Sequence, residues 1–333
     1  VGSSVTVPVE DGKLALGRVR IFNDPNDLGM LFVACIPMAA YLSSRGGLMG
    51  LRRLFWLTIA GVLVYGVYLT DSRGALLSLL AVMGVYIWQR RGVFVAGVLG
   101  VMAVAVLMAL PSRFSEIDAE EASAHGRIES WYEGLEMFRG HPVFGVGPDM
   151  YTEFNPLTAH NSFVLILAET GIIGYTLWLA FVVYGFRMMW AGSRRIEAPP
   201  YGDEQSDHDT DTDADADADA AAAAAAAADA SADDDAMDFE ALDARIDEGR
   251  AIAMTLMLSL VGFFVSAFFL SRSYLVILYL LAALVVAHYA DIQRDDPGLP
   301  QFALGKDAIL WPVVGVGSTF LLYLVVKVLL VTQ

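Results

Sequence analysis

Long runs of uncharged, mostly apolar residues, separated by short charged turns, dominate the chain. An α-helix rises about 1.5 Å per residue and needs about 20 apolar residues to cross a bilayer. Eight runs reach that length or approach it with help from flanking residues: Leu28–Ser44, Leu54–Thr70, Gly74–Gln89, Gly92–Ser112, Asn161–Phe186, Ala251–Ser271, Ser273–Ala290 and Ala308–Val326. The pattern predicts an all-α, polytopic integral membrane bundle of about eight spans.

Composition supports a membrane protein. Hydrophobic residues make up 56% of the chain and the mean hydropathy is +0.54, whereas soluble domains are usually about 45–50% apolar. Cys35 is the only cysteine and lies in an apolar run, so no internal disulfide is possible. The chain begins with Val1 and shows no signal peptide before Leu28, so we expect a fragment that lacks N-terminal spans.

Arginines in short loops set the orientation, because basic residues are retained on the cytoplasmic side. Three clusters follow the first, third and fifth runs: Arg45, Arg52 and Arg53; Arg90 and Arg91; and Arg187, Arg194 and Arg195. With all three inside, the outer face receives the segment before Leu28, the turn Thr70–Gly74, the loop Pro111–His160 and the turn Leu270–Tyr274. Both ends of the chain then lie outside.

Most of the formal charge of −17 comes from one segment. Residues 203–248 hold 18 acidic residues and one arginine, so the rest of the chain balances at 20 acidic and 20 basic residues. This Asp/Ala-rich tract buries too little apolar surface to order itself, which predicts a disordered cytoplasmic linker. It lacks the glycine and the glutamate of a calcium-binding loop, so no metal site is expected there.

The runs and loops divide the chain into five parts. Residues 1–110 hold an outer segment and the first four spans, 111–160 an extracytoplasmic loop, 161–190 one span, 191–250 the acidic linker, and 251–333 three C-terminal spans.

The outer loop contains an amphipathic helix. Ile128, Trp131, Leu135 and Phe138 recur at helical spacing and form one apolar face, and the helix should end near Gly140. Such a helix either lies in the membrane interface, with Trp131 and Tyr132 at headgroup depth, or only caps the bundle. A start near Gly126 and Arg127 would leave backbone N–H groups free for an anion.

Three polar residues reach the same outer surface, which is unusual because ionisable groups near a membrane are costly. Arg73 either pairs with Asp71 as an anchor or contacts an anion such as a lipid phosphate, and Arg127 could bind the same anion. His160 is either a helix cap or a general base for an alcohol, since imidazole titrates near neutral pH.

Glu169 lies nine residues after His160 in the same run. That is roughly 13 Å along a helix, so we expect no direct contact with His160. Glu169 should pair with a basic group in the bundle or stay protonated. Gly171 and Gly174 beside it permit close helix packing.

Several motifs carry a family resemblance. In order they are "RIFNDPNDLGMLF", "TDSRGALL", "HGRIESWYEGLEMFRGHPVFGVGPDMY" and "HNSFVLILAETGIIGY", from about Arg18 to Trp190. The sequence resembles the bacterial O-antigen ligase and O-antigen polymerase superfamily. The chain lacks the N-terminal spans that such proteins generally have, and the Asp/Ala-rich insertion is atypical.

The resemblance implies an inverting, metal-independent glycosyltransferase of lipopolysaccharide biosynthesis in the bacterial inner membrane, with its active site facing the periplasm. Its donor would be an undecaprenyl-diphosphate-linked glycan, and its acceptor a hydroxyl of lipid A core, another glycan or a protein. It implies that Arg73 and Arg127 bind the diphosphate and that His160 activates the acceptor. Supporting residues would come from a further set: Arg18, Arg20, Asn161, Glu169 and Arg272. No cofactor and no nucleic-acid partner are expected.

Three alternatives stay open. A polymerase that joins repeat units on the lipid carrier would differ only in its acceptor. A transporter would place polar groups near the bilayer midplane and often in repeated halves, whereas this sequence has no repeat. A scaffold subunit of a polysaccharide assembly complex would need no catalytic set.

Overall fold

A computed structural model describes residues 24–45, 50–109, 117–194, 218–271 and 273–331. Within these ranges the ordered elements are helices and no strand occurs. In chain order they are α1 (Pro25–Ser44), α2 (Leu51–Leu69), α3 (Arg73–Arg91), α4 (Val93–Ala109), α5 (Ile117–Gly140), α6 (Tyr151–Phe154), α7 (Ser162–Ser193), α8 (Ala218–Ala267), α9 (Val276–Asp295) and α10 (Leu310–Val331). The prediction of an all-α membrane bundle is confirmed.

Eight of these helices occupy the eight predicted spans, but only six of them are long and apolar enough to cross a membrane: α1, α2, α7, α9, α10 and residues 242–267 of α8. The terminal Arg73, Arg90 and Arg91 lower the hydropathy of α3, and α4 has only 17 residues. Within the described residues, six of the eight predicted spans are therefore confirmed.

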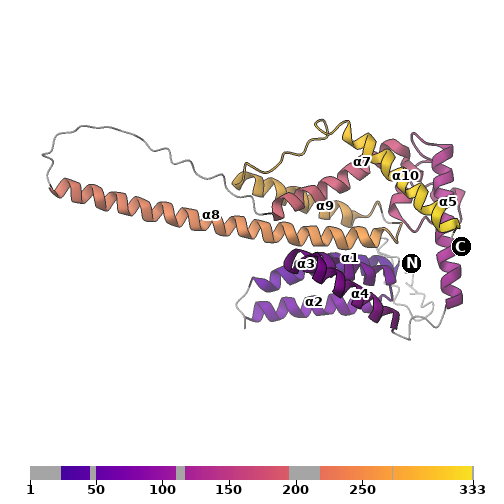
Figure 1. Cartoon of the computed structure of the whole chain (residues 1–333), viewed down its shortest axis with the longest axis horizontal. Coiled ribbons are helices and arrows are strands. Elements are labelled where there is room, and N and C mark those ends of the chain that lie inside the picture. The colour runs from indigo at the N-terminus through magenta and orange to yellow at the C-terminus, as the bar shows by residue number, and fades with distance from the viewer. Residues whose placement is uncertain (1–23, 46–49, 110–116, 195–217, 272, 332–333) are drawn as a thin grey trace, which may run out of the picture.

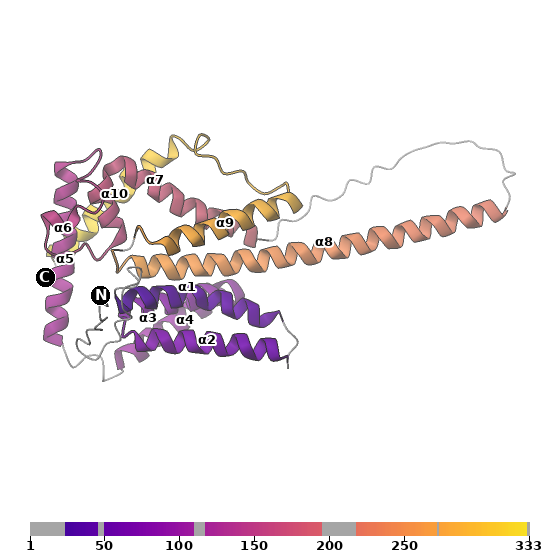
Figure 2. The same cartoon turned by 180° about the vertical axis from the view of Figure 1, so that it is seen from behind.

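The membrane half of α8 lies between two groups of helices (Figures 1 and 2). α1 and α3 pack on one side of it, with α2 and α4 beyond them, and α7 and α9 pack on the other, with α10 beyond α7. Phe263 and Met257 of α8 are buried in the central cluster together with Met30 of α1 and Met189 of α7. The hydrophobic effect of this cluster joins the two groups.

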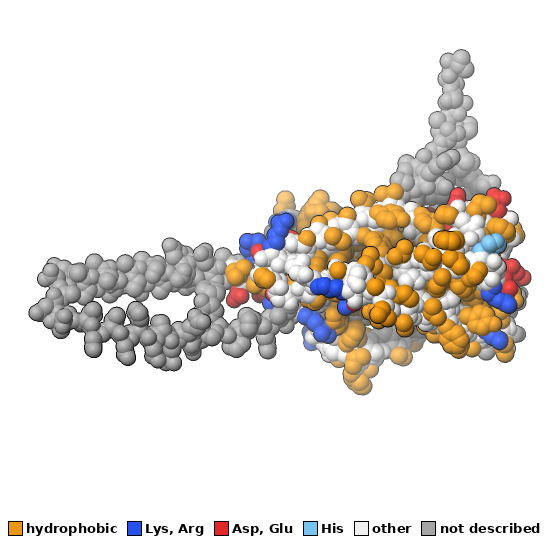
Figure 3. Space-filling view, turned by 90° about the horizontal axis from the view of Figure 1, so that it is seen from above, with side chains coloured by type: hydrophobic (Ala, Val, Ile, Leu, Met, Phe, Trp, Pro, Cys, Tyr) orange, Lys and Arg blue, Asp and Glu red, His pale blue; other side chains and the backbone are white. Residues whose placement is uncertain are grey.

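Apolar side chains cover much of the outer flank, as Figure 3 shows for one face. Large hydrophobic residues of α2, α4, α9 and α10 are exposed, among them Phe55, Phe94, Leu280 and Phe320. Water-exposed surfaces rarely carry apolar patches of this extent, so these faces contact lipid. The chain is a multi-pass membrane protein.

The helix ends that the sequence predicted to lie outside meet at one end of the bundle. Gly29 near the start of α1 packs against Ala75 of α3, and Gly74 faces Phe269 just after α8. α5 runs across this end in Figure 1, which we call the α5 end. The predicted inner arginines lie toward the opposite end.

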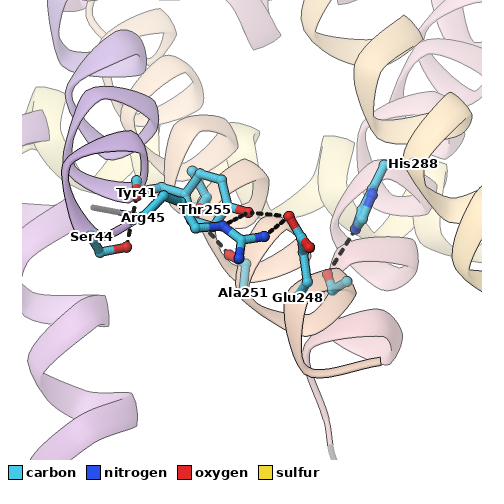
Figure 4. A network of polar contacts seen from close by, with 8 residues as sticks. Tyr41, Ser44, Arg45, Glu248, Ala251, Thr255 and His288 are labelled. Atoms are coloured by element: carbon cyan, nitrogen blue, oxygen red, sulfur yellow. Dashed lines mark hydrogen bonds and ion pairs between the residues drawn. The ribbon is translucent and has the colours of Figure 1, made fainter. Parts of the chain in front are cut away.

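A polar network joins α1, α8 and α9 at that opposite end (Figure 4). Arg45 Nε donates to the Tyr41 hydroxyl at 2.8 Å, and Tyr41 donates to Glu248 Oε1 at 3.3 Å. Arg45 also forms an ion pair with Glu248, and His288 Nε2 lies 2.8 Å from the Gly249 carbonyl oxygen. Because exposed ion pairs stabilise little, the network mainly fixes how α8 leaves the bundle.

The acidic segment differs from its prediction in its second half. The disordered linker was predicted over residues 191–250, but α7 continues to Ser193 and α8 is helical from Ala218. The first half of α8 projects beyond the other helices (Figure 2). Alanine is the strongest helix former, so the alanine run can extend the membrane helix without a core. Residues 195–217 lie outside the described structure.

α5 confirms the predicted amphipathic helix and its end at Gly140. Trp131 and Leu135 are buried, but against protein: Trp131 packs edge-on to Phe268 at 5.8 Å between ring centroids. Trp131 therefore contacts protein, whereas Tyr132 is exposed. The buried Tyr151 of α6 donates its hydroxyl to the Ser130 carbonyl oxygen, which fixes α6 beneath α5.

α7 is broken at Gly171, where φ is +63° and ψ is −167°. The turn after α5 fills the break with main-chain hydrogen bonds. Val146 N–H donates to the Ala168 carbonyl at 3.0 Å, and Gly147 N–H to that of Glu169 at 2.9 Å. Beyond the break, Ile172 N–H donates to the Pro142 carbonyl at 2.9 Å, and Ile173 N–H to that of Val143 at 3.5 Å. We call this exchange the clasp.

The clasp satisfies backbone groups that a break in a membrane helix would otherwise leave unpaired, a costly state in lipid. It also requires glycine. A Cβ on Gly171 would lie 2.4 Å from the Val143 carbonyl oxygen, and one on Gly145 would lie 2.3 Å from the carbonyl carbon of Glu169. The helix packing expected at Gly171 is thus replaced by a close approach of the turn after α5.

We predict that Gly171→Ala lowers the melting temperature of the detergent-solubilised protein. Its left-handed backbone alone should cost about 1–3 kcal/mol for a residue with a Cβ, and the clash with Val143 adds to this. Gly61→Ala in α2 is the matched control, because nothing lies within 4 Å of the new methyl group and alanine favours a helix. Equal melting temperatures for the two variants would contradict the clasp.

We also predict that Tyr151→Phe destabilises the protein by about 0.5–1.5 kcal/mol, the usual net value of a hydrogen bond, whereas Tyr132→Phe on the exposed face changes nothing. Burial raises the pKa of Tyr151 above its usual value of 10. The unfolded chain therefore loses this proton first, and the stability difference narrows as pH rises above 10. Thermal melts from pH 7 to 11 measure both effects, and a constant difference over that range would argue against the hydrogen bond.

Candidate functional site at the α5 end

A pocket of about 280 Å³ opens at the α5 end. Four parts of the chain form its walls: the N-cap of α1, the segment around α6, the first half of α7 with the loop before it, and the turn between α8 and α9. The lining residues are Asp24, Asp149, Tyr151, Thr152, Thr158, His160, Leu165, Glu169, Leu270, Ser271, Tyr274 and Leu275. Most of them are polar, which is unusual beside a membrane-spanning helix.

His160 lies at the pocket wall directly before α7. It is half-buried and has a positive φ of 47°, a conformation that L-residues rarely adopt and that surrounding structure must enforce. Asn161, and not His160, caps the helix: its Oδ1 accepts from Phe163 N–H at 2.9 Å and from Val164 N–H at 3.2 Å. His160 therefore does not cap α7 and instead lines the pocket, which favours the base hypothesis over the cap.

Glu169 reaches the same pocket from the last turn before the break in α7. Its side chain is 2% exposed. Oε1 accepts from Tyr151 N–H at 3.3 Å, and Oε2 accepts from the Tyr274 hydroxyl at 2.9 Å. Neutral donors therefore hold the carboxylate, and the basic partner expected from the sequence is not among these contacts.

Tyr274 lies in the turn between α8 and α9. Burial, and then the negative charge of Glu169, raise the pKa of its hydroxyl, so it stays protonated and remains a donor. The turn itself is tied to the start of α7, because Ser162 Oγ donates to the Leu270 carbonyl at 2.6 Å and Ser273 Oγ donates to the Ser162 carbonyl at 3.1 Å.

The two arginines expected to bind a diphosphate are at the same end but do not line the pocket. Arg73 starts α3 and is exposed; the adjacent Gly74 packs on Phe269, next to Leu270 of the pocket wall. Arg127 is exposed on α5, next to Gly126, which approaches Leu157 at 3.9 Å.

One expectation about Arg127 was wrong. α5 begins at Ile117, so Gly126 and Arg127 lie inside the helix rather than at its start. Their N–H groups therefore belong to the helix ladder and are not free for an anion. Arg18, Arg20 and Arg272 lie outside the described residues.

Sequence reasoning missed four pocket residues: Asp24, Asp149, Tyr151 and Tyr274. Three of them stood within motifs that were noted: Asp24 in "FNDPND", and Asp149 and Tyr151 in "VGPDMY". The signal that could have found the two aspartates is that each lies in a Pro-containing turn beside a membrane span. A carboxylate so close to the membrane is costly and usually has a functional role.

Two comparisons with known proteins found a match. The O-antigen ligase family profile matches residues 30–179, which include most of α1, all of α2 to α6, the clasp and the first part of α7. An O-antigen polymerase of Salmonella muenchen is 26% identical over 192 residues, which cover 51% of this chain and 47% of that protein. The chain thus spans about half the length of this relative. No solved structure matches the chain.

The matched region contains Arg73, Arg127, His160 and Glu169 together with the loop that builds the pocket. The profile match, the polymerase relative and the multi-pass helical architecture support the assignment of this chain to the O-antigen ligase and O-antigen polymerase superfamily.

Proposed function

We propose that the protein is a membrane glycosyltransferase that transfers a glycan from undecaprenyl diphosphate to an acceptor hydroxyl. The observation that carries the proposal is the polar pocket at the α5 end, in which His160 faces a cavity beside a membrane span. In bacteria the arginine-rich end would lie in the cytoplasm, so the pocket would open to the periplasmic side of the inner membrane.

In the proposed reaction His160 removes the proton from the acceptor hydroxyl. The oxygen then attacks the anomeric carbon of the donor glycan from the side opposite the diphosphate. The bond between that carbon and the diphosphate oxygen breaks, and the configuration inverts. A positioned base typically contributes about 10²–10⁴-fold to such a rate.

Arg73 and Arg127 would stabilise the negative charge that develops on the leaving diphosphate. Guanidinium groups suit this task because their planar donors match phosphate oxygens and they are always charged. Two positive charges placed next to the leaving diphosphate favour the transition state over the ground state. With this charge stabilisation, the leaving diphosphate does not require a metal ion.

A scaffold or transporter would not need this arrangement. The polar lining lies at one end of the bundle, next to α5 and the turn before α9, and not around the centres of the spans. Transporters generally bind their substrates near the bilayer midplane. The position of the pocket therefore favours chemistry at the membrane surface.

We predict that the purified full chain transfers glycan from an undecaprenyl-diphosphate donor and keeps this activity in EDTA. His160→Ala should reduce the rate about 10²–10⁴-fold, and Arg127→Ala should reduce it through loss of charge stabilisation. Radiolabelled transfer to acceptor measures the rate.

His141→Ala is the matched control for the histidine, because His141 is exposed in the turn after α5 and does not line the pocket. Unchanged transfer in folded His160→Ala would return this residue to a structural role. No transfer by the wild type with any acceptor would instead favour the scaffold or transporter alternatives.

A second candidate, polymerisation of repeat units on the lipid carrier, is favoured by the name of the Salmonella relative. Product length separates the two activities. A ligase moves the glycan to a different acceptor and leaves its length unchanged, whereas a polymerase produces a ladder of longer lipid-linked glycans when it is given the donor alone. Gel analysis with the donor alone distinguishes these outcomes.

A further inference from the structure

The pocket lining has a chemical character that the proposed reaction does not by itself explain. Three carboxylates, those of Asp24, Asp149 and Glu169, line one cavity, and among its described lining residues none is lysine or arginine. Carboxylates at short range repel a diphosphate, since like charges in a partly buried site interact strongly. The cavity that contains the candidate base is therefore poorly suited to the anionic part of the donor.

The same lining suits a sugar. Carboxylates accept hydrogen bonds from hydroxyl groups, and these charge-assisted bonds are roughly twice as strong as neutral ones. Thr152, Thr158, Ser271 and Tyr274 add hydroxyls that can donate or accept. The volume of about 280 Å³ lies just below the range of about 300–1,000 Å³ found for drug-sized ligands, so the cavity fits a small glycan unit and not a long chain.

We propose that this pocket is the acceptor subsite and that it binds an uncharged, polyhydroxylated sugar of the acceptor glycan through Glu169. The inference rests on the proposed function and deepens it: His160 meets the acceptor inside the pocket, while the diphosphate stays outside it on the Arg73 and Arg127 side. Tyr274 acts as a positioning residue for Glu169.

Glu169 is held in the orientation that this role needs. Oε1 accepts from Tyr151 N–H and Oε2 accepts from the Tyr274 hydroxyl, and the backbone N–H of Asp149 is a further donor to the same carboxylate. Because each carboxylate oxygen can accept two hydrogen bonds, these three donors leave one acceptor position for a ligand. The clasp fixes the main chain of Glu169, since its carbonyl accepts from Gly147 N–H.

Ser271 supplies an independent indication. Its Oγ is buried, lines the pocket and has no hydrogen-bond partner within the described structure. Buried hydroxyl groups in proteins are nearly always hydrogen-bonded. A sugar hydroxyl in the cavity would satisfy this group as well as Glu169.

The direct test is calorimetric binding of an uncharged hexose oligosaccharide to the full chain in detergent micelles, without donor. Glu169→Gln should weaken binding about tenfold or more, because the charge-assisted bonds become neutral ones. Tyr274→Phe should weaken it less, since the carboxylate remains but is no longer held. Tyr279→Phe, on the exposed face of α9, is the matched control and should bind as the wild type does.

Steady-state kinetics separate a positioning role from a structural one. Glu169→Gln and Tyr274→Phe should raise KM for the acceptor and leave KM for the lipid donor unchanged, whereas Arg127→Ala should weaken use of the donor and leave oligosaccharide binding intact. Melting temperatures near that of the wild type establish that the variants are folded.

The outcomes also separate the subsite from the proposed function. If the wild type transfers glycan and Glu169→Gln binds the oligosaccharide as the wild type does, the subsite is overturned and the proposed function stands. The same conclusion follows if inorganic diphosphate competes with the oligosaccharide for the pocket. Binding that depends on Glu169 in a protein without transfer activity overturns the glycosyltransferase and keeps the sugar site. A wild-type protein that does not bind the oligosaccharide overturns the subsite.

Discussion

The clasp between the turn after α5 and the break in α7 is the interaction on which the site depends. Four main-chain hydrogen bonds of 2.9–3.5 Å replace the helix ladder at Gly171, and they need positive φ at both Gly145 and Gly171. Main-chain bonds do not depend on side-chain identity, so the surrounding residues are free to serve chemistry. Through the clasp, one turn sets the position of Glu169 on α7 and of Asp149 and Tyr151 beyond the turn.

The break also divides α7 into two parts with different surroundings. From Val164 to Glu169 every side chain is buried in protein, whereas beyond Gly171 exposed residues such as Ile173 and Leu177 alternate with buried ones. The first part is thus a protein-enclosed helix that carries a carboxylate, and the second is a lipid-facing membrane helix. A polar cavity can exist at the membrane surface because protein, not lipid, surrounds this first part.

The sequence was sufficient for features that repeat along the chain. Apolar run length located the membrane helices, and the spacing of Trp131 and Leu135 located α5. It could not locate the break at Gly171, because an apolar run reads the same whether its helix is continuous or interrupted, and the partner carbonyls lie in a turn with no periodicity. The role of Tyr274 could not be predicted for a similar reason: hydrogen bonds of Ser162 and Ser273 bring its turn to α7, and no sequence pattern indicates these contacts. In the acidic segment, low hydrophobicity suggested disorder, whereas the helix propensity of alanine decided the conformation of α8.

The pocket walls come from residues as far apart in sequence as Asp24, at the start of the described chain, and Leu275, directly before α9. Contacts between residues so distant in sequence carry a high loop-closure cost and form late in folding. During synthesis the turn before α9 is therefore the last wall to arrive, after α1, α5 and α7 have been made. Until that turn is inserted, Glu169 lacks Tyr274 and the nascent chain presents an incomplete cavity, so the proposed sugar subsite is complete only once α1 to α8 and this turn are in place.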